Sequence, residues 1–137
     1  MSAALELITT RPWNPDTDKP FVMATWLKGL LYGDSWFSII PKDVFMPTYH
    51  AFLTQLLDSP GVEVTIACLV EDPDVIVGYS VATNTVLHWV FCKKAWRKIG
   101  VARLLLPKTV STVSHLTDLG RKLLPKLPDV VFNPFIA

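Results

Sequence analysis

The sequence predicts an α/β fold in one domain, residues 1–137, with about six strands and about four helices. Half of the 137 residues are hydrophobic, which is ample for one packed core. Turn-forming residues divide the chain into short β-branched runs and longer runs with helical spacing. No repeat, linker or low-complexity tract interrupts this series, so we expect one folding unit.

The first half of the chain predicts one strand and two helices. The run Leu5–Arg11 precedes the breaker-rich segment 12–15, which predicts an opening strand. Apolar residues then recur at helical spacing from Asp16 to Gly33, where glycine ends the helix. A second helix is expected over Lys42–Leu57, because its apolar residues form one broad face.

Three strands are predicted in the middle of the chain. The β-branched runs Val62–Val70 and Val75–Thr83 flank the turn Glu71–Asp74, which is a strong hairpin signal. Thr85–Cys92 is apolar on both faces, as expected for a central strand covered on both sides. The remaining elements are a helix over Gly100–Leu106, a strand over Val110–His115, a helix over Leu119–Leu127 and a strand over Val130–Phe135.

Charge is distributed unevenly, although the net charge is only +1. Residues 1–74 carry ten acidic and four basic residues, whereas residues 75–117 contain six basic residues and no acidic one. The acid-free segment indicates either a bound polyanion, such as a nucleotide cofactor or nucleic acid, or a merely basic face. Its basic residues are Lys93, Lys94, Arg97, Lys98, Arg103 and Lys108.

Several other classes of protein do not fit the sequence. No apolar run is long enough to span a membrane, and the N-terminus lacks the order of a signal peptide. We therefore expect a cytoplasmic protein in which Cys68 and Cys92 are reduced thiols in apolar strands. His50, His88 and His115 show no ligand spacing with either cysteine, so no metal site is predicted. The apolar surplus then fits a buried sheet or a subunit interface, such as that of a homodimer.

The stretch 86–106 carries the strongest functional signal. An apolar strand enters a basic loop, and a helix leaves the loop at Gly100. A loop that opens a helix exposes unpaired backbone N–H groups, which bind phosphate oxygens with the help of the helix dipole. Glycine at position 100 permits close approach, while Arg97 and Lys98 offer charge-assisted hydrogen bonds to the same anion.

The segment Arg97–Ala102 resembles the Gln/Arg-x-x-Gly-x-Gly/Ala signature of the GNAT superfamily of N-acyltransferases. The order of strands and helices also resembles the family layout over most of the chain, which implies a mixed, mostly antiparallel central sheet. The closing segment Val131–Phe135 is similar to the ends of small phage-encoded members.

This resemblance implies a cofactor, acetyl-coenzyme A. In the family, the signature loop binds the pyrophosphate, and the preceding strand offers backbone groups to the pantetheine arm. The cofactor-binding residues that it implies are Phe91, Cys92, Lys93, Arg97, Lys98, Ile99, Gly100, Val101 and Ala102.

The chain also departs from the family pattern. Lys98 and Lys94 stand where members often have glycine and proline, and the last of the usual seven strands is not recognisable. Many members use a tyrosine in a later helix to protonate the departing thiolate. All three tyrosines of this chain precede the signature, so no residue matches that role by type.

His88 and His115 are the candidate catalytic residues. Acyl transfer to an amine needs a base, and the strand before the loop contains no carboxylate for that role. The pKa of His88 on this strand suits a base near neutral pH, whereas the alternative is a core histidine with one hydrogen-bond partner. The family layout places His115 near the cofactor sulfur as a proton donor, while the alternative is a helix cap around Thr117 and Asp118.

In the family, the first two helices and their connecting loop recognise the acceptor. Here that region contains Tyr32, Asp34 and Trp36, and aromatic rings with carboxylates suit a cationic amine, although such rings also serve as core. The resemblance thus implies direct acetyl transfer to an amine on a small molecule, a protein lysine or a protein N-terminus. Two alternatives stay open: a non-catalytic GNAT-like binding or virion-associated protein, and a nucleic-acid-binding module that uses the basic segment.

Overall fold

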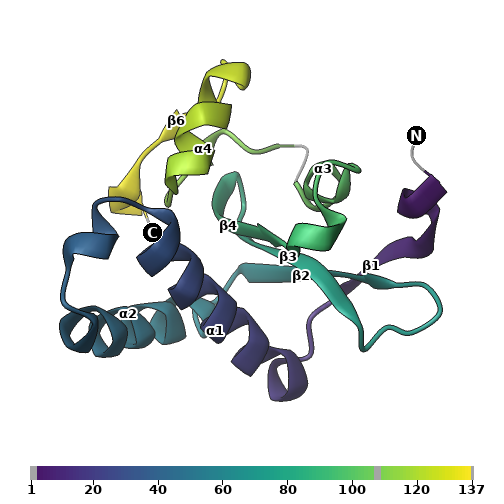
Figure 1. The fold of residues 1–137 in the computed structure, drawn as a ribbon, viewed down its shortest axis with the longest axis horizontal. Helices are drawn as coiled ribbons and strands as arrows, with labels where there is room; N and C mark the ends of the chain where they lie inside the picture. Colours follow the sequence, from purple (N-terminus) through teal and green to yellow (C-terminus); the bar gives the residue numbers. More distant parts are fainter. Residues whose placement is uncertain (1–2, 107–108, 137) are drawn as a thin grey trace.

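A computed structural model describes residues 3–106 and 109–136 and contains one six-stranded mixed sheet (Figure 1). The first four strands pair antiparallel in chain order, and the last two continue the sheet in parallel. The strands are β1 (Ile8–Pro12), β2 (Val62–Leu69), β3 (Ile76–Thr83), β4 (Val86–Cys92), β5 (Thr112–Val113) and β6 (Val131–Phe132). The predicted mixed, mostly antiparallel sheet is confirmed.

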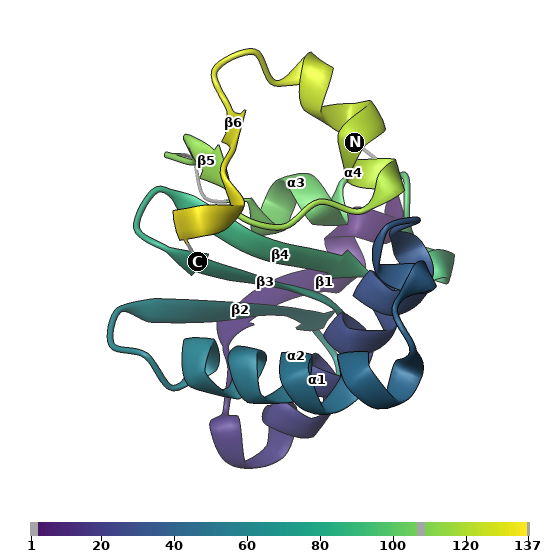
Figure 2. The ribbon, with the colours of Figure 1, turned by 90° about the vertical axis from the view of Figure 1, so that its left-hand side faces the viewer.

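Helices cover both faces of this sheet. The α-helices are α1 (Pro15–Gly33), α2 (Lys42–Leu57), α3 (Val101–Leu105) and α4 (Asp118–Leu123). Figures 1 and 2 show α1 and α2 together on one face and α3 on the other. The predicted order of strands and helices is confirmed, and α2 has the predicted boundaries. None of the helices in the described ranges is long and apolar enough to cross a membrane.

Four predicted elements, the first strand, the last two strands and the last helix, differ in extent. The first strand begins at Ile8, after a 3-10 turn over Ala3–Leu7, because the ladder with β2 ends where Ile8 meets Leu69. The last two strands are two residues each, and β6 stops before Asn133 and Pro134, whose ring removes a backbone donor. The last predicted helix divides into α4 and a 3-10 turn that contains Pro125.

A pair of stacked tryptophans fixes β4 against α1. The rings of Trp26 and Trp89 lie 5.7 Å apart at an interplanar angle of 14°, and both side chains are buried. Gly29 allows this approach, because a Cβ there would lie 2.7 Å from Cζ2 of Trp89. The position of β4 relative to the helix layer therefore depends on one glycine and two indoles.

A partly buried ion pair ties the start of α1 to β1. Both Nη atoms of Arg11 donate to the carboxylate of Asp18, at 2.7 and 3.2 Å, and the backbone N–H of Asn14 donates to it at 2.7 Å. Asp18 is 4% exposed. The hydrogen bond from Arg11 holds the pKa of this carboxyl below its ordinary value, although burial acts in the opposite direction.

We predict that Asp18→Asn lowers the free energy of unfolding at pH 7 by about 3 kcal/mol, because Arg11 loses its charge partner. The depressed pKa means that this stabilisation is present above the ordinary carboxyl pKa of about 4 and is lost as pH falls through the lower folded value. In urea unfolding, the difference between wild type and variant should therefore shrink below about pH 4.

The matched control for this prediction is Asp16→Asn, because Asp16 is exposed on the same helical turn. Its unfolding free energy should stay within about 0.5 kcal/mol of the wild type at every pH. An Asp18→Asn difference that is the same at pH 7 and at pH 3 would contradict the role of the ion pair.

Candidate active site

The site begins where β4 and β5 part. These strands pair only at Val86 with Thr112 and at Leu87 with Val113. The N–H of Ser114 then donates to the carbonyl of Leu87 at 3.0 Å, and the ladder stops. From His88 onward β4 pairs only with β3 among the described strands, and in Figure 2 the chain after β5 turns away toward α4. One backbone edge of β4 is therefore open.

A β-bulge lies at His88. The neighbouring β3 residues Val81 and Ala82 oppose Trp89 and Leu87, so His88 is the extra residue of β4. A bulge of this kind interrupts the alternation of side chains and is common next to functional sites. Here it occurs at the first residue of β4 that no longer pairs with β5.

The structure brings the two predicted catalytic histidines together. Nδ1 of His88 lies 2.7 Å from Oγ of Ser114, which in turn lies 2.9 Å from Nδ1 of His115. At the other end, Nε2 of His88 lies 2.9 Å from Oγ1 of Thr83. His88 and Ser114 are each 2% exposed. In the sequence the two histidines are separate candidates, and only the fold shows that Ser114 links them and that Thr83 adjoins His88.

The ring of His115 packs among aromatic side chains of α1 and α2. Its centroid lies 5.7 Å from Trp26, 6.3 Å from Tyr49 and 5.9 Å from Phe52. Burial, with a smaller effect from His88, lowers the pKa of His115 to about 4, and burial also lowers the pKa of His88. Both rings are therefore neutral near pH 7.

Nε2 of His115 is free for a ligand. No described residue forms a hydrogen bond with it, yet it is not sealed from solvent. Among the described side chains, only the indole N–H groups of Trp26 and Trp89 are both enclosed and without a partner.

The loop after β4 has a backbone suited to an anion. Two of its residues, Lys98 and Gly100, have positive φ values of 67° and 104°. In the described part of the chain, none of the backbone N–H groups from 98 to 103 donates a well-formed hydrogen bond. Successive free N–H groups in such a turn form a concave anion-binding surface. The helix that follows has only five residues, so the expected dipole contribution is small and the loop itself supplies the donors.

Basic side chains surround this loop without acidic partners. Lys94, Arg97, Lys98 and Arg103 are exposed and form no ion pair within the described ranges. Lys93 instead lies 5.4 Å from the ring centroid of Phe21. Lys108, the sixth basic residue of the predicted segment, lies outside the described residues. The cluster therefore has positive charge available for a ligand.

Arg97 is anchored at the end of β4. Its Nε donates to the carbonyl of Cys92 at 3.0 Å, which leaves its Nη atoms without a partner among the described residues. The N–H of Lys93 donates to the carbonyl of Val77 at 2.8 Å. These two bonds fix the start of the loop. They occupy the carbonyl of Cys92 and the N–H of Lys93.

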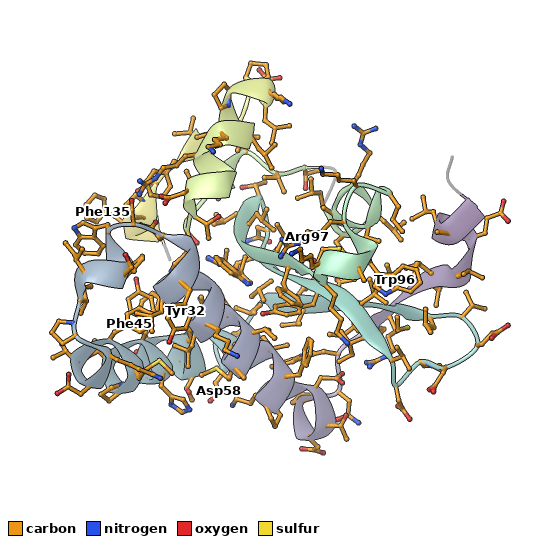
Figure 3. The ribbon with its side chains drawn as sticks, in the orientation of Figure 1. Tyr32, Phe45, Asp58, Trp96, Arg97 and Phe135 are labelled. Carbon is orange, nitrogen blue, oxygen red and sulfur yellow. The ribbon has the colours of Figure 1, made fainter. Side chains whose placement is uncertain are left out.

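The predicted acceptor residues have different environments. Tyr32 is 67% exposed and Trp36 is 59% exposed, whereas Asp34 is 2% exposed. The carboxylate of Asp34 accepts from the backbone N–H of Trp36 at 2.8 Å and from Nη2 of Arg121 at 3.3 Å. Asp34 therefore holds the loop that carries Trp36. Figure 3 shows Tyr32 on α1 and Arg97 in the loop beside α3. The helices α1 and α3 cover opposite faces of the sheet.

Two hollows on the described surface lie away from the loop. One of about 530 Å³ adjoins Trp13 between β1 and β2, and one of about 680 Å³ lies between α1 and α2 beside Met23 and His50. Neither is lined by a residue of the 93–103 segment. The described residues contain no cluster of three or more His, Cys, Asp or Glu side chains that could hold a metal ion.

No protein-family model matches the chain, and no curated protein matches it in sequence. Solved structures do match. A GCN5-related N-acetyltransferase from Ralstonia eutropha JMP134 superimposes with a TM-score of 0.62 at 10% identity, over 88% of this chain and 90% of that one. A predicted acetyltransferase with acetyl-CoA from Clostridium acetobutylicum gives 0.60 at 14% identity, over 88% of each chain. The chain has the fold of the GNAT acetyltransferases.

Other structures with this fold agree. A possible acetyltransferase from Clostridium difficile 630 superimposes with a TM-score of 0.56 at 14% identity, over 91% of each chain. Some matched chains are longer: this chain spans 60% of YjaB from Escherichia coli, at a TM-score of 0.51 and 16% identity. It spans 62% of a Staphylococcus aureus acetyltransferase and 11% of a fungal multi-domain β-N-acetylglucosaminidase. The fold expected from the Arg97–Ala102 resemblance is confirmed.

We predict that Lys98→Gly raises the free energy of unfolding by about 0.5–1 kcal/mol, because a left-handed backbone strains every residue that carries a Cβ. Asn84, the other non-glycine residue described with a positive φ, is the matched control at 51°. Asn84→Gly should gain less, since asparagine tolerates this conformation better than lysine. Urea unfolding measures both; a loss of stability in Lys98→Gly would show that Lys98 is not strained.

Proposed function

We propose that this chain is an N-acyltransferase that binds acetyl-coenzyme A at the Arg97–Ala102 loop and transfers its acetyl group directly to an amine. One observation carries the proposal: backbone N–H groups without a well-formed hydrogen bond and unpaired basic side chains occur together in the loop that follows the unpaired part of β4. The GNAT fold supports it by analogy only.

The residues of the loop fit the pyrophosphate. The N–H groups of Lys98, Ile99, Gly100 and Ala102 make no well-formed hydrogen bond within the described chain and can donate to its oxygens, and the guanidinium of Arg97 adds charge-assisted bonds. Val101 is 1% exposed, so it contributes packing rather than a donor. A Cβ at Gly100 would meet only Leu5, at 3.5 Å, so the protein's own packing leaves this position open toward a ligand.

The open edge of β4 fits the pantetheine arm. This part of β4 has only one described neighbour, and among the predicted residues the N–H of Cys92 is on the open side. The N–H of Lys93 donates to Val77 of β3, and by the alternation of an antiparallel ladder Phe91 also faces β3. Amide groups of an extended ligand can add to such an edge as a further strand would. When bound, the coenzyme supplies an acyl group activated as a thioester.

The acceptor side is proposed to lie at the ends of α1 and the following loop. Tyr32 and Trp36 present exposed aromatic rings that suit a cationic amine. Asp34 acts as a positioning residue, because its carboxylate is occupied by Arg121 and by the N–H of Trp36. His115, with Nε2 free, and His88 behind it are the proposed groups for proton transfer. The amine belongs to a small molecule, a protein lysine or a protein N-terminus.

We predict that acetyl-coenzyme A raises the melting temperature of the wild type and that Gly100→Glu removes this shift. A carboxylate at position 100 would lie where the pyrophosphate oxygens bind, and like charges repel, so affinity should fall by about 100-fold or more. Thermal unfolding with increasing coenzyme, and with 3′-dephospho-coenzyme A, measures this.

Gly61→Glu is the matched control, because Gly61 also has a positive φ, 83°, and a Cβ there would meet no atom within 4 Å. It carries the same backbone strain and the same added charge away from the loop, and it should keep the shift. Absence of any coenzyme effect on the wild type would refute cofactor binding. A strong, salt-sensitive stabilisation by a short DNA duplex would instead favour nucleic-acid binding.

A further inference from the structure

We propose that Thr83, His88, Ser114 and His115 form a proton relay that switches Nε2 of His115 between proton acceptor and proton donor while both imidazoles stay neutral. The inference rests on the proposed function, because the proton that it removes is that of the acceptor amine. Ser114 is the residue on which the relay depends.

The hydroxyl of Ser114 makes all hydrogen bonds of the relay donate in the same direction along the chain of four groups. It holds one proton and lies within hydrogen-bond distance of two imidazole nitrogens, Nδ1 of His88 at 2.7 Å and Nδ1 of His115 at 2.9 Å. It donates to one of them, so the other must carry a proton and donate to Ser114. The two rings therefore cannot choose their tautomers independently.

Two arrangements satisfy every bond in the chain. In the first, Nδ1 of His115 donates to Ser114, Ser114 donates to Nδ1 of His88, and Nε2 of His88 donates to Thr83. Nε2 of His115 then has a free lone pair and is a base. In the second, every donor is reversed, starting from the hydroxyl of Thr83, and Nε2 of His115 carries a proton.

Passing from the first arrangement to the second removes a proton from an amine without charging a ring. The acceptor enters as its ammonium form: one of its N–H bonds breaks, the electron pair stays on nitrogen as the lone pair that attacks the thioester, and an N–H bond forms at Nε2 of His115. Its Nδ1 proton moves to Ser114, the Ser114 proton to Nδ1 of His88, and the Nε2 proton of His88 to Thr83. Thr83 releases its own hydroxyl proton to water, since it is half-buried beside exposed Asn84.

The surroundings favour such a neutral relay over a charged base. Trp26, Tyr49 and Phe52 enclose the His115 ring, and no described carboxylate or cation contacts either imidazole. An imidazolium would be poorly solvated there, which is why burial lowers the pKa of His115. A relay lets Nε2 accept a proton while the charge is delivered to solvent at Thr83.

Histidine NMR of the full-length chain tests the relay without any catalysis. At pH 7 we expect each ring of the wild type to be singly protonated, and Ser114→Ala to change the Nδ1 and Nε2 shifts of both rings. Ser80→Ala is the matched control, because Ser80 is equally buried and donates to the Leu105 carbonyl at 3.1 Å, outside the relay. A doubly protonated ring at pH 7, or equal His115 spectra in the two variants, would overturn the proposal.

Kinetics with acetyl-coenzyme A and a primary amine test whether the relay takes part in acetyl transfer. Ser114→Ala should lower kcat on the order of 100-fold with the coenzyme Kd unchanged, and Ser114→Thr, which keeps a hydroxyl, should recover most of the rate. His115→Phe keeps the aromatic packing and should lose the rate as Ser114→Ala does. A Ser114→Ala enzyme as fast as the wild type would overturn the relay and leave the acyltransferase proposal standing.

The two proposals fail in different ways. If the wild type acetylates no amine, the proposed function fails and with it the relay's use in acyl transfer. The NMR arm then still decides whether the four groups share their protons, because it requires neither cofactor nor acceptor. Loss of rate in Ser114→Ala with unchanged histidine spectra would also overturn the relay, since it would show an effect of packing alone.

Discussion

Backbone hydrogen bonding along β4 is the constraint from which the rest of the site follows. Its first two residues have neighbours on both sides, while the remainder has β3 alone. The unpaired edge, the bulge at His88 and the loop proposed to bind an anion all occur within the residues that follow this change. A ligand that pairs with the open edge would take the place of a neighbouring strand there.

The helix layer gives this open edge a fixed position. The stack of Trp26 on Trp89 sets the distance between α1 and β4, and Gly29 permits it. Trp26 also contacts His115, so the same indole supports the strand on one side and the proposed relay on the other. Rigid aromatic packing is suited to this task, because proton transfer requires donor and acceptor atoms to stay within hydrogen-bond distance.

Much of the fold could be predicted from the sequence, because periodicity and turn residues act locally. The hairpin at Glu71–Asp74, the helix over Lys42–Leu57 and the loop at Gly100 are of this kind. The bulge at His88 is not, since it depends on the register between two strands. The link through Ser114 and the pairing of Asp34 with Arg121 join residues that are far apart in the chain. No periodic pattern reveals such pairs.

Because β5 and β6 are short, we expect the protein to unfold locally at its C-terminal segment first. Two-residue ladders join residues 111–136 to the sheet, helped by contacts such as those of Asp118 with Ser35 and of Arg121 with Asp34. Segments held so lightly open at a lower free energy than a four-stranded antiparallel core. Ser114 lies in that segment, whereas His88 lies in the core. At moderate temperature or low denaturant concentration, such a molecule would lose the proposed activity while most of its tertiary structure stays folded.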